Sequence, residues 1–484
     1  MYRFSCGATV VLLFAAGLAA QNRPAFSDVT RQFISVDAPV VALEHVRVID
    51  GTGAAAAENQ TIVIENGTIR SVGPAGSVSL PPGAQVMDLS GHTVIPGLVG
   101  MHDHMYYTGP SGYGHLAGAP TLYPEMGFTF PRLYLASGVT TIRTTGSVEP
   151  YTDLQLKQEI DSGYIPGPEM FVTGPYLEGA GNMAQIQMHW LSGPDDATRL
   201  VNYWADEGVT SFKAYTHITR AELAAAVKAA HARGLKITGH LCSIGFREAA
   251  ELGIDDLEHG LRVDTEFDPG KQQDACPPGS DTTSTLVKLD LKSQQVHDMI
   301  HDLVQRRVAI TSTLPVFENS VPGRPVQQRV LQVLSPPAVG DFLLGRLRAA
   351  QADETPAILF RKGEQFEHDF VQAGGLLLAG PDPTGYGGIV AGFGDQREVE
   401  LLVEAGFTPL EAVHIATQNG AQYLGIADKV GTVQVGKQAD LAVVRGDPSQ
   451  KIDDIENVEI VFKGGVGYDS HKLIQSVQGQ VGLQ

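Results

Sequence analysis

The chain has 484 residues, of which 43% are hydrophobic and 18% are charged, and its formal net charge is -20. This composition belongs to a folded globular protein rather than to a disordered or collagen-like chain. The negative charge disfavours binding to nucleic acid and to anionic lipid surfaces, and the sequence has no basic run, zinc-finger spacing or Walker-type phosphate loop.

The N-terminus, residues 1–20, has the pattern of a secretory signal peptide: one Arg, an apolar run, and small residues at Ala19 and Ala20. The apolar part is short for a bilayer span. We therefore expect cleavage after Ala20 and a secreted or periplasmic protein with no stable membrane span, an uncleaved anchor being the alternative. The two remaining cysteines, Cys242 and Cys276, could form a disulfide in an oxidising compartment or stay free.

Short alternating strands separated by turn residues open the mature chain, and they predict the N-terminal part of a β-domain over residues 21–94. The predicted strands are Val40–Asp50, Gln60–Ile64, Thr68–Arg70 and Gln85–Leu89.

The sequence pattern then changes to short apolar runs, each followed by a stretch with helical period. Thr219 and Glu222, for example, form a capping-box pattern that opens a helix ending near Arg233 and Gly234. Eight such units predict a TIM-type (β/α)8 barrel over residues 95–425. Its strands are the run from Ile95 to His104 and the runs 140–144, 170–173, 209–215, 236–241, 255–259, 308–314 and 376–379, and the helices 397–406 and 409–425 close it.

The C-terminal segment, residues 426–484, returns to strands at 431–448 and 458–463. These strands are too few to bury a core of their own. We therefore expect them to complete the N-terminal module, so that both ends of the chain build one small composite β-sandwich domain.

Groups able to bind metal recur at the ends of the predicted barrel strands. In such a barrel, the active site lies at the C-terminal ends of the strands. On a strand, His102 and His104 point to the same face because side chains alternate. Five strand ends carry six such groups: His102, His104, Lys213, His240, His259 and Asp382.

Each of these residues has an ordinary structural explanation when taken alone. A His at a strand end is usually a hydrogen-bonded structural residue, a lone Lys213 would reach to solvent, and Asp382 before Pro383 would form a turn. Their joint placement favours a site for a divalent ion such as zinc. A second ion could bind if the Lys213 amine reacts with CO₂ to give a bridging carbamate.

Several phrases of the sequence resemble the amidohydrolase superfamily. They are TVIPGLVGMHDH, FKAY after an apolar strand, LEHG, and GTVQVGKQADLAVV, in the ligand order His-x-His, Lys, His, His, Asp. The resemblance covers about Val40 to Lys463 and is strongest to the imidazolonepropionase-related and prolidase-like branch.

The resemblance implies a dinuclear centre with two divalent ions, expected to be Zn²⁺. It places His102, His104 and Asp382 on one ion, His240 and His259 on the other, and carbamylated Lys213 between them. A metal-activated hydroxide would attack the substrate, and Asp382 would be the catalytic proton carrier. The sequence departs from the family pattern at two places near the site: residues 142–146 (IRTTG) lack the usual Arg-Asp, and GPDP surrounds Asp382.

Substrate contacts are predicted from the loops after the strands. The candidates are Tyr176, His189 and Tyr215, with His217 and the loop 261–286 as further ones, although loop packing or solvent exposure explains each singly. His92, His115, Asp103 and Cys242 are interpreted as structural or supporting residues.

Together these features predict a secreted hydrolase that cleaves an amide bond of a dipeptide or N-acyl amino acid. The alternatives are a cyclic amide hydrolase, a lactonase or esterase, or a xenobiotic amide hydrolase with the same site. A non-catalytic metal-binding protein and a metal-free ligand-binding barrel remain alternatives from other classes. We expect a small-molecule or dipeptide substrate and a homo-oligomer.

Overall fold

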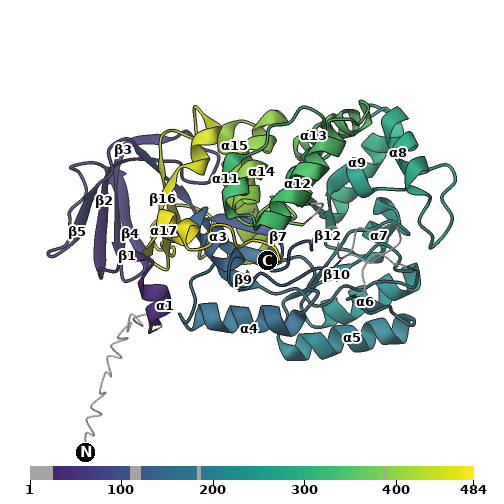
Figure 1. Ribbon diagram of the computed structural model, residues 1–484, viewed down its shortest axis with the longest axis horizontal. Coiled ribbons are helices and arrows are strands. Elements are labelled where there is room, and N and C mark those ends of the chain that lie inside the picture. Colours follow the sequence, from purple (N-terminus) through teal and green to yellow (C-terminus); the bar gives the residue numbers. More distant parts are fainter. Residues whose placement is uncertain (1–24, 110–121, 182–186, 385–386, 484) are drawn as a thin grey trace, which may run out of the picture.

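The computed structural model describes residues 25–109, 122–181, 187–384 and 387–483 (Figure 1). The predicted signal peptide, residues 1–20, and His115 lie outside these ranges. Among the residues that are described, no helix combines the length and the apolar character that a membrane crossing requires.

Eight strands of the described chain form two parallel sheets, so the fold is mixed α/β. One sheet has the order β7-β8-β9 and the other β10-β11-β12-β13-β14. Each predicted run from 95 to 379 overlaps one of these strands: β7 (Leu98–Asp103), β8 (Val139–Thr144), β9 (Glu169–Phe171), β10 (Ser211–Ala214), β11 (Lys236–Gly239), β12 (Asp256–Glu258), β13 (Ala309–Ser312) and β14 (Leu377–Ala379).

Helices follow most of these strands along the chain. The predicted start of α6 is confirmed, because Thr219 and Glu222 form a capping box. The helices between the strands are α3 (Phe130–Ala136), α4 (Pro150–Asp161), α5 (Pro194–Glu207), α6 (Arg220–Ala232), α7 (Phe246–Leu252), the 3₁₀ turn η1 (Gly260–Val263), α8 (Gly279–Lys288), α9 (Gln294–Arg306), α10 (Leu314–Glu318), α11 (Gln328–Val333), α12 (Pro336–Ala349) and α13 (Thr355–Gln372). After β14 come α14 (Phe393–Glu404), α15 (Pro409–His414), a π-helical turn (Ile415–Asn419) and α16 (Gly420–Leu424).

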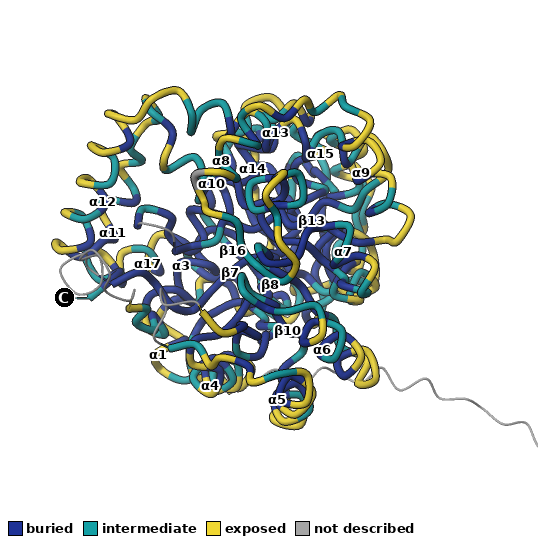
Figure 2. Tube along the Cα trace, turned by 90° about the vertical axis from the view of Figure 1, so that its right-hand side faces the viewer, coloured by how far each residue is buried: buried dark blue, intermediate teal, exposed yellow. Residues whose placement is uncertain are grey.

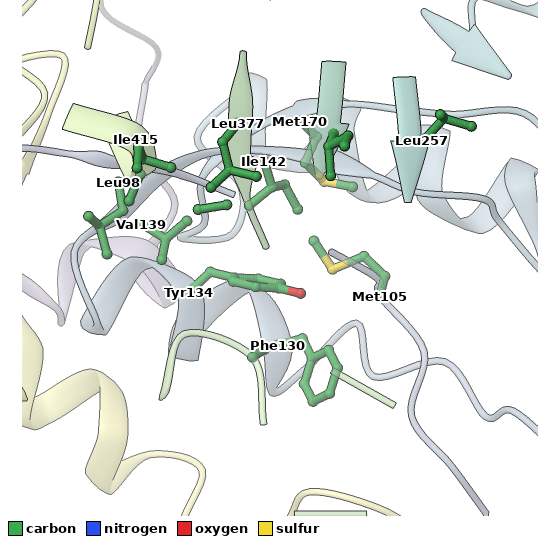
Figure 3. Close-up of a cluster of buried hydrophobic side chains, with 14 of the residues drawn as sticks. Leu98, Met105, Phe130, Tyr134, Val139, Ile142, Met170, Leu257, Leu377 and Ile415 are labelled. Carbon is green, nitrogen blue, oxygen red and sulfur yellow. The ribbon is translucent and has the colours of Figure 1, made fainter. Parts of the chain in front are cut away.

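The parallel strands form the most buried part of the molecule (Figure 2). Every residue of β7 and β8 is buried, as expected for strands that are covered on both faces. Figure 3 shows buried side chains of the parallel strands, among them Leu98, Ile142, Met170 and Leu377, packed with Phe130 and Tyr134 of α3. This packing holds the strand ends, and the polar groups on them, in fixed positions.

A nine-stranded sheet combines strands from both ends of the chain, at the left of Figure 1. Its order is β1-β17-β16-β15-β6-β2-β3-β4, with β5 paired to β2. The strands are β1 (Ile34–Val36), β2 (Val40–Val48), β3 (Ala57–Glu65), β4 (Thr68–Pro74), β5 (Gln85–Asp88), β6 (His92–Pro96), β15 (Leu441–Arg445), β16 (Val458–Lys463) and β17 (Val466–Asp469). A short helix, α1 (Asp28–Arg31), precedes it, and a 3₁₀ turn (Ile452–Glu456) lies between β15 and β16.

Two boundaries differ from the sequence analysis. Ile95, expected in the first barrel strand, pairs with Ala442 in the nine-stranded sheet, and the chain passes from that sheet into β7 at Gly97. There is no room for a side chain at Gly97, since an added Cβ would lie 2.1 Å from the Thr140 hydroxyl. The C-terminal residues also leave the sheet: α17 (Ser470–Gln475) packs on α3, where the Ser470 hydroxyl donates to the carbonyl of Ala136 at 2.6 Å.

Cys242 and Cys276 form a disulfide, with their Cα atoms 5.1 Å apart. Cys242 follows β11 by three residues, and Cys276 lies in the long loop between η1 and α8. The bond therefore ties that loop to the end of a central strand. Of the two alternatives left by the sequence, the structure has the paired cysteines.

Candidate metal centre

Three predicted ligands meet at the ends of β7 and β14. The ligand atoms of His102, His104 and Asp382 all lie within 4.8 Å of one another. The two histidines share a side because they alternate with Asp103 along the strand. Asp382 has φ 52°, and its backbone N–H donates to the carbonyl of His102 at 3.0 Å, so the two strand ends hold this carboxylate beside the imidazoles.

The other three predicted ligands surround this group. Lys213 Nζ lies 3.1 Å from His102 Nε2. The ring centroid of His259 is 4.6 Å from that of His102 and 4.4 Å from that of His240. The fold thus brings together all six side chains from the ends of five strands.

Hydrogen bonds orient the histidines so that one nitrogen of each is available. The Nδ1 atom of His102 donates to Glu258 Oε2 at 2.6 Å, and Nδ1 of His104 donates to the carbonyl of Gly146 at 3.2 Å. Nδ1 of His259 contacts the Thr313 hydroxyl at 2.8 Å. The Nε2 atoms of His102 and His104 are therefore unprotonated, the form in which histidine binds metals, and their neighbours in the structure are the Lys213 amine and the Tyr106 hydroxyl.

One of these nitrogens is an orphan: Nε2 of His259 is buried and has no hydrogen-bond partner among the described residues. A buried polar atom without a partner is unfavourable unless a ligand satisfies it. Imidazoles with a carboxylate are a donor set that suits zinc and similar divalent ions. The residues present therefore fit a divalent metal.

Electrostatics keep the donors in their binding forms at neutral pH. Burial, and then the charge of Lys213, lowers the pKa of His240 to about 3, and burial lowers the pKa of His102, His104 and His259. Burial alone would raise the pKa of Asp382, but the neighbouring histidines hold it well below its usual value. The imidazoles are thus neutral and the carboxylate is charged.

Burial also lowers the pKa of Lys213 to about 8. A larger share of this amine is neutral at physiological pH than for an exposed lysine. Neutral amine is the form that reacts with CO₂. The environment of Lys213 is therefore compatible with a carbamate.

A buried network of hydrogen bonds and ion pairs supports the predicted ligand His102. Glu258, which accepts from His102, also accepts from Arg143 Nη2 at 2.9 Å, and Arg143 bonds Asp256 at 2.8 Å. The Thr238 hydroxyl also donates to the carboxylate of Glu258. Arg143, in the segment that departs from the pattern of relatives, thus anchors the carboxylate that orients a ligand.

Phenol groups cover one side of the centre. The hydroxyl of Tyr106 lies 3.4 Å from His104 Nε2 and is hydrogen-bonded to the hydroxyl of Tyr176. Tyr215 follows, with its ring centroid 4.8 Å from that of Tyr176 and 5.1 Å from that of His240. Two predicted substrate contacts, Tyr176 and Tyr215, therefore lie beside the predicted ligands.

The remaining candidates lie elsewhere. His189 is exposed, and its Nε2 contacts Asp196 at the start of α5 rather than a metal ligand. His217 contacts the hydroxyl of Thr216. Of the residues interpreted as structural, His92 contacts Glu459 in the nine-stranded sheet, and Asp103 faces Tyr134 and Asp395, away from the histidine rings.

Tyr106 and Glu258 were not singled out from the sequence. Tyr106 continues the alternation of His102 and His104, so the same two-residue period could have identified it. Glu258 directly precedes His259, but its side chain reaches a histidine that lies 156 residues earlier. No local pattern signals such a contact.

Comparisons with known proteins show a family relationship and similar folds. A family model described as the amidohydrolase family matches residues 93–310 and 391–467. A comparison with curated proteins finds no significant match. Among solved structures, a candidate prolidase from Bifidobacterium longum is 25% identical, with a TM-score of 0.62, and the alignment covers 90% of this chain and 98% of that one.

Two further solved structures share the fold at lower identity. A Xaa-Pro dipeptidase with bound methionine in the active site is 22% identical, with a TM-score of 0.66 and coverage of 89% of this chain and 100% of that one. An ochratoxinase from A. niger is 18% identical, with a TM-score of 0.62 and coverage of 90% and 96%.

Proposed function

We propose a specific reaction for this chain, which belongs to the amidohydrolase family, whose members are metal-dependent. The chain is a hydrolase that acts on amide bonds. We propose that its substrate is a dipeptide or an N-acyl amino acid. The observation that carries the proposal is the meeting of His102, His104 and Asp382 beside an orphan His259 nitrogen.

The proposed centre holds two divalent ions, of which zinc is the best match to the donors. His102, His104 and Asp382 would hold one ion, His240 and His259 the other, and a carbamate on Lys213 would bridge them. When bound, the ions lower the pKa of a water molecule and polarise the scissile carbonyl.

The residues of the chain supply the rest of the chemistry. Asp382, charged and in contact with His104 Nε2 at 3.4 Å, accepts the proton of the attacking water and passes it to the leaving nitrogen. The phenol of Tyr106 lies beside the same imidazole and donates to the oxygen that gains charge when the carbonyl is attacked.

We also propose that the eight parallel strands close into one (β/α)8 barrel over residues 95–425. Parallel bridges from Thr173 to Ser211 and from Leu177 to Ala214 connect the β9 side to β10. At the other edge, Asp382 N–H donates to the His102 carbonyl, and Gly380 lies so close that an added Cβ would be 2.2 Å from His102 N. These contacts support closure between β14 and β7.

The proposal retains the remaining predictions. Residues 21–94 and 426–484 would form the composite β-domain, apart from the C-terminal helix described above. The mature protein would begin after Ala20 and act outside the cytoplasm, as a homo-oligomer.

The test is hydrolysis of a library of dipeptides and N-acyl amino acids by zinc-loaded protein that starts at Gln21. Asp382→Asn should reduce kcat by about 10²- to 10⁴-fold, because it removes a general base and acid. A matched control is Asp255→Asn, whose carboxylate bonds His231 and the N–H of Ile237 near the start of β12. That variant should keep the wild-type rate.

Activity that persists in Asp382→Asn would reject the proposed mechanism. A wild-type protein that binds zinc but leaves the whole library intact would reject the substrate class. The search would then move to cyclic amides, lactones and xenobiotic amides.

A further inference from the structure

Arg262 is a half-buried arginine close in sequence to the predicted ligand His259, and none of the described residues supplies it with a counter-charge. It lies in η1, three residues after the predicted ligand His259. Among the described residues, its guanidinium forms neither a hydrogen bond nor an ion pair, and it lies over the ring of Phe317. The ranges outside the description contain no Asp or Glu, so no acidic side chain is left to pair with it.

Other buried or half-buried arginines of the protein have polar partners. Arg143 pairs with two carboxylates, Arg247 with Glu266, and Arg397 with Glu318. Arg132, which has no carboxylate, donates to a backbone carbonyl at 2.7 Å. The chain has 54 Asp and Glu against 34 Lys and Arg, so a shortage of acids does not explain the unpaired guanidinium.

One aromatic side chain lies near both Arg262 and the predicted ligand His259. Phe317, in α10, has its ring centroid 5.9 Å from that of His259, and the guanidinium carbon of Arg262 lies 4.9 Å from the same Phe317 ring. One aromatic ring thus contacts both a predicted ligand and the guanidinium. Both elements that carry these residues follow neighbouring strands, β12 and β13.

The contact with Phe317 does not replace a counter-ion. A cation–π contact is weaker than an ion pair with a carboxylate, so the ring compensates only in part for the missing acid. In agreement, burial lowers the pKa of Arg262, with no acid nearby to oppose the effect. A flat ring does, however, hold the planar guanidinium in one orientation, which prepares it for a planar anion.

We infer that Arg262 binds the carboxylate of the substrate through its guanidinium fork. This inference rests on the proposed amide hydrolysis and makes Arg262 the residue that selects substrates with a free carboxylate. An amide-capped or esterified substrate cannot form the charged pair. The enzyme should therefore discriminate between an acid and its carboxamide even when the scissile bond is the same.

Two measurements test the inference. In the first, kcat and KM are measured for the best library substrate and for its C-terminal carboxamide. In the second, calorimetry measures binding of N-acetyl-L-methionine, N-acetyl-L-methionine amide and inorganic phosphate to the zinc-loaded protein. Both use the wild type, Arg262→Gln, Arg262→Lys and the control Arg247→Gln, which removes an arginine of α7 that is paired with Glu266.

The wild type should prefer the acid by about 10- to 100-fold, the usual effect of a hydrogen bond to a charged group. Arg262→Gln should remove this preference by raising KM for the acid, with kcat and the carboxamide changed less than about twofold. Arg262→Lys should keep part of the preference, because it keeps the charge but loses the fork. Arg247→Gln should behave like the wild type.

The outcomes separate this inference from the proposed function. If the wild type has no preference for the acid, or if the preference survives in Arg262→Gln, the inference is wrong although hydrolysis stands. If nothing is hydrolysed but Arg262→Gln loses the binding preference for the acid, the proposed function fails and Arg262 remains a carboxylate site. Binding of phosphate without discrimination between acid and amide would identify a general anion site and overturn the inference.

Discussion

Glu258 provides the sharpest test of how the metal centre is supported. Its carboxylate accepts from His102 at 2.6 Å, from Arg143 at 2.9 Å and from the Thr238 hydroxyl. In Glu258→Gln, the amide oxygen can face only one of the two nitrogen donors well, and the amide NH₂ then meets the other donor. Either His102 or Arg143 loses its acceptor.

The expected loss can be stated for metal binding and for stability separately. Removal of a carboxylate that orients a ligand histidine weakens metal binding by about 10- to 100-fold, which is about 1.4–2.7 kcal/mol. Loss of one hydrogen bond to a charged group lowers the free energy of unfolding by about 1.5–3 kcal/mol. Asp256 still pairs with Arg143 at 2.8 Å, so the variant should fold.

The assay is competition for zinc between the protein and a chromophoric chelator, with circular dichroism to confirm folding. The matched control is Glu222→Gln, a buried glutamate that caps α6 through Thr219. It should lose stability without losing zinc affinity. A folded Glu258→Gln protein whose zinc affinity equals that of the wild type would refute the supporting role of Glu258.

Two further predictions concern the groups around the proposed ions. Tyr106→Phe should lower kcat by about 10²-fold with KM and zinc content unchanged, because only the hydroxyl beside His104 is lost. The control is Tyr468→Phe in β17. If Tyr106→Phe changes KM by an equal factor, Tyr106 contributes to substrate binding instead. Burial lowers the pKa of Lys213 to about 8, so its neutral fraction rises as the pH passes through that value. At fixed dissolved CO₂, reactivation of metal-stripped protein by zinc should therefore be roughly tenfold faster at pH 9 than at pH 7, and a rate independent of pH and CO₂ would exclude the carbamate.

Local sequence patterns predicted much of this protein. The alternation of apolar runs with helical segments predicted where the eight parallel strands lie in the sequence. The composition of an apolar run favours a buried strand whichever strands lie beside it. The same patterns placed His102, Lys213 and His259 at strand ends. The capping box of α6 was equally readable, because both of its partners lie within three residues.

Only the tertiary structure decided which side chains meet. The contacts of Glu258 with His102 and with Arg143 join residues more than a hundred positions apart, and no local propensity encodes such a pairing. The same holds for Ile95, whose apolar run suits a strand of either sheet until Ala442 is placed beside it. Whether Arg262 has a carboxylate partner depends on the positions of all the acidic side chains around it. Only the tertiary structure gives these positions for the described residues.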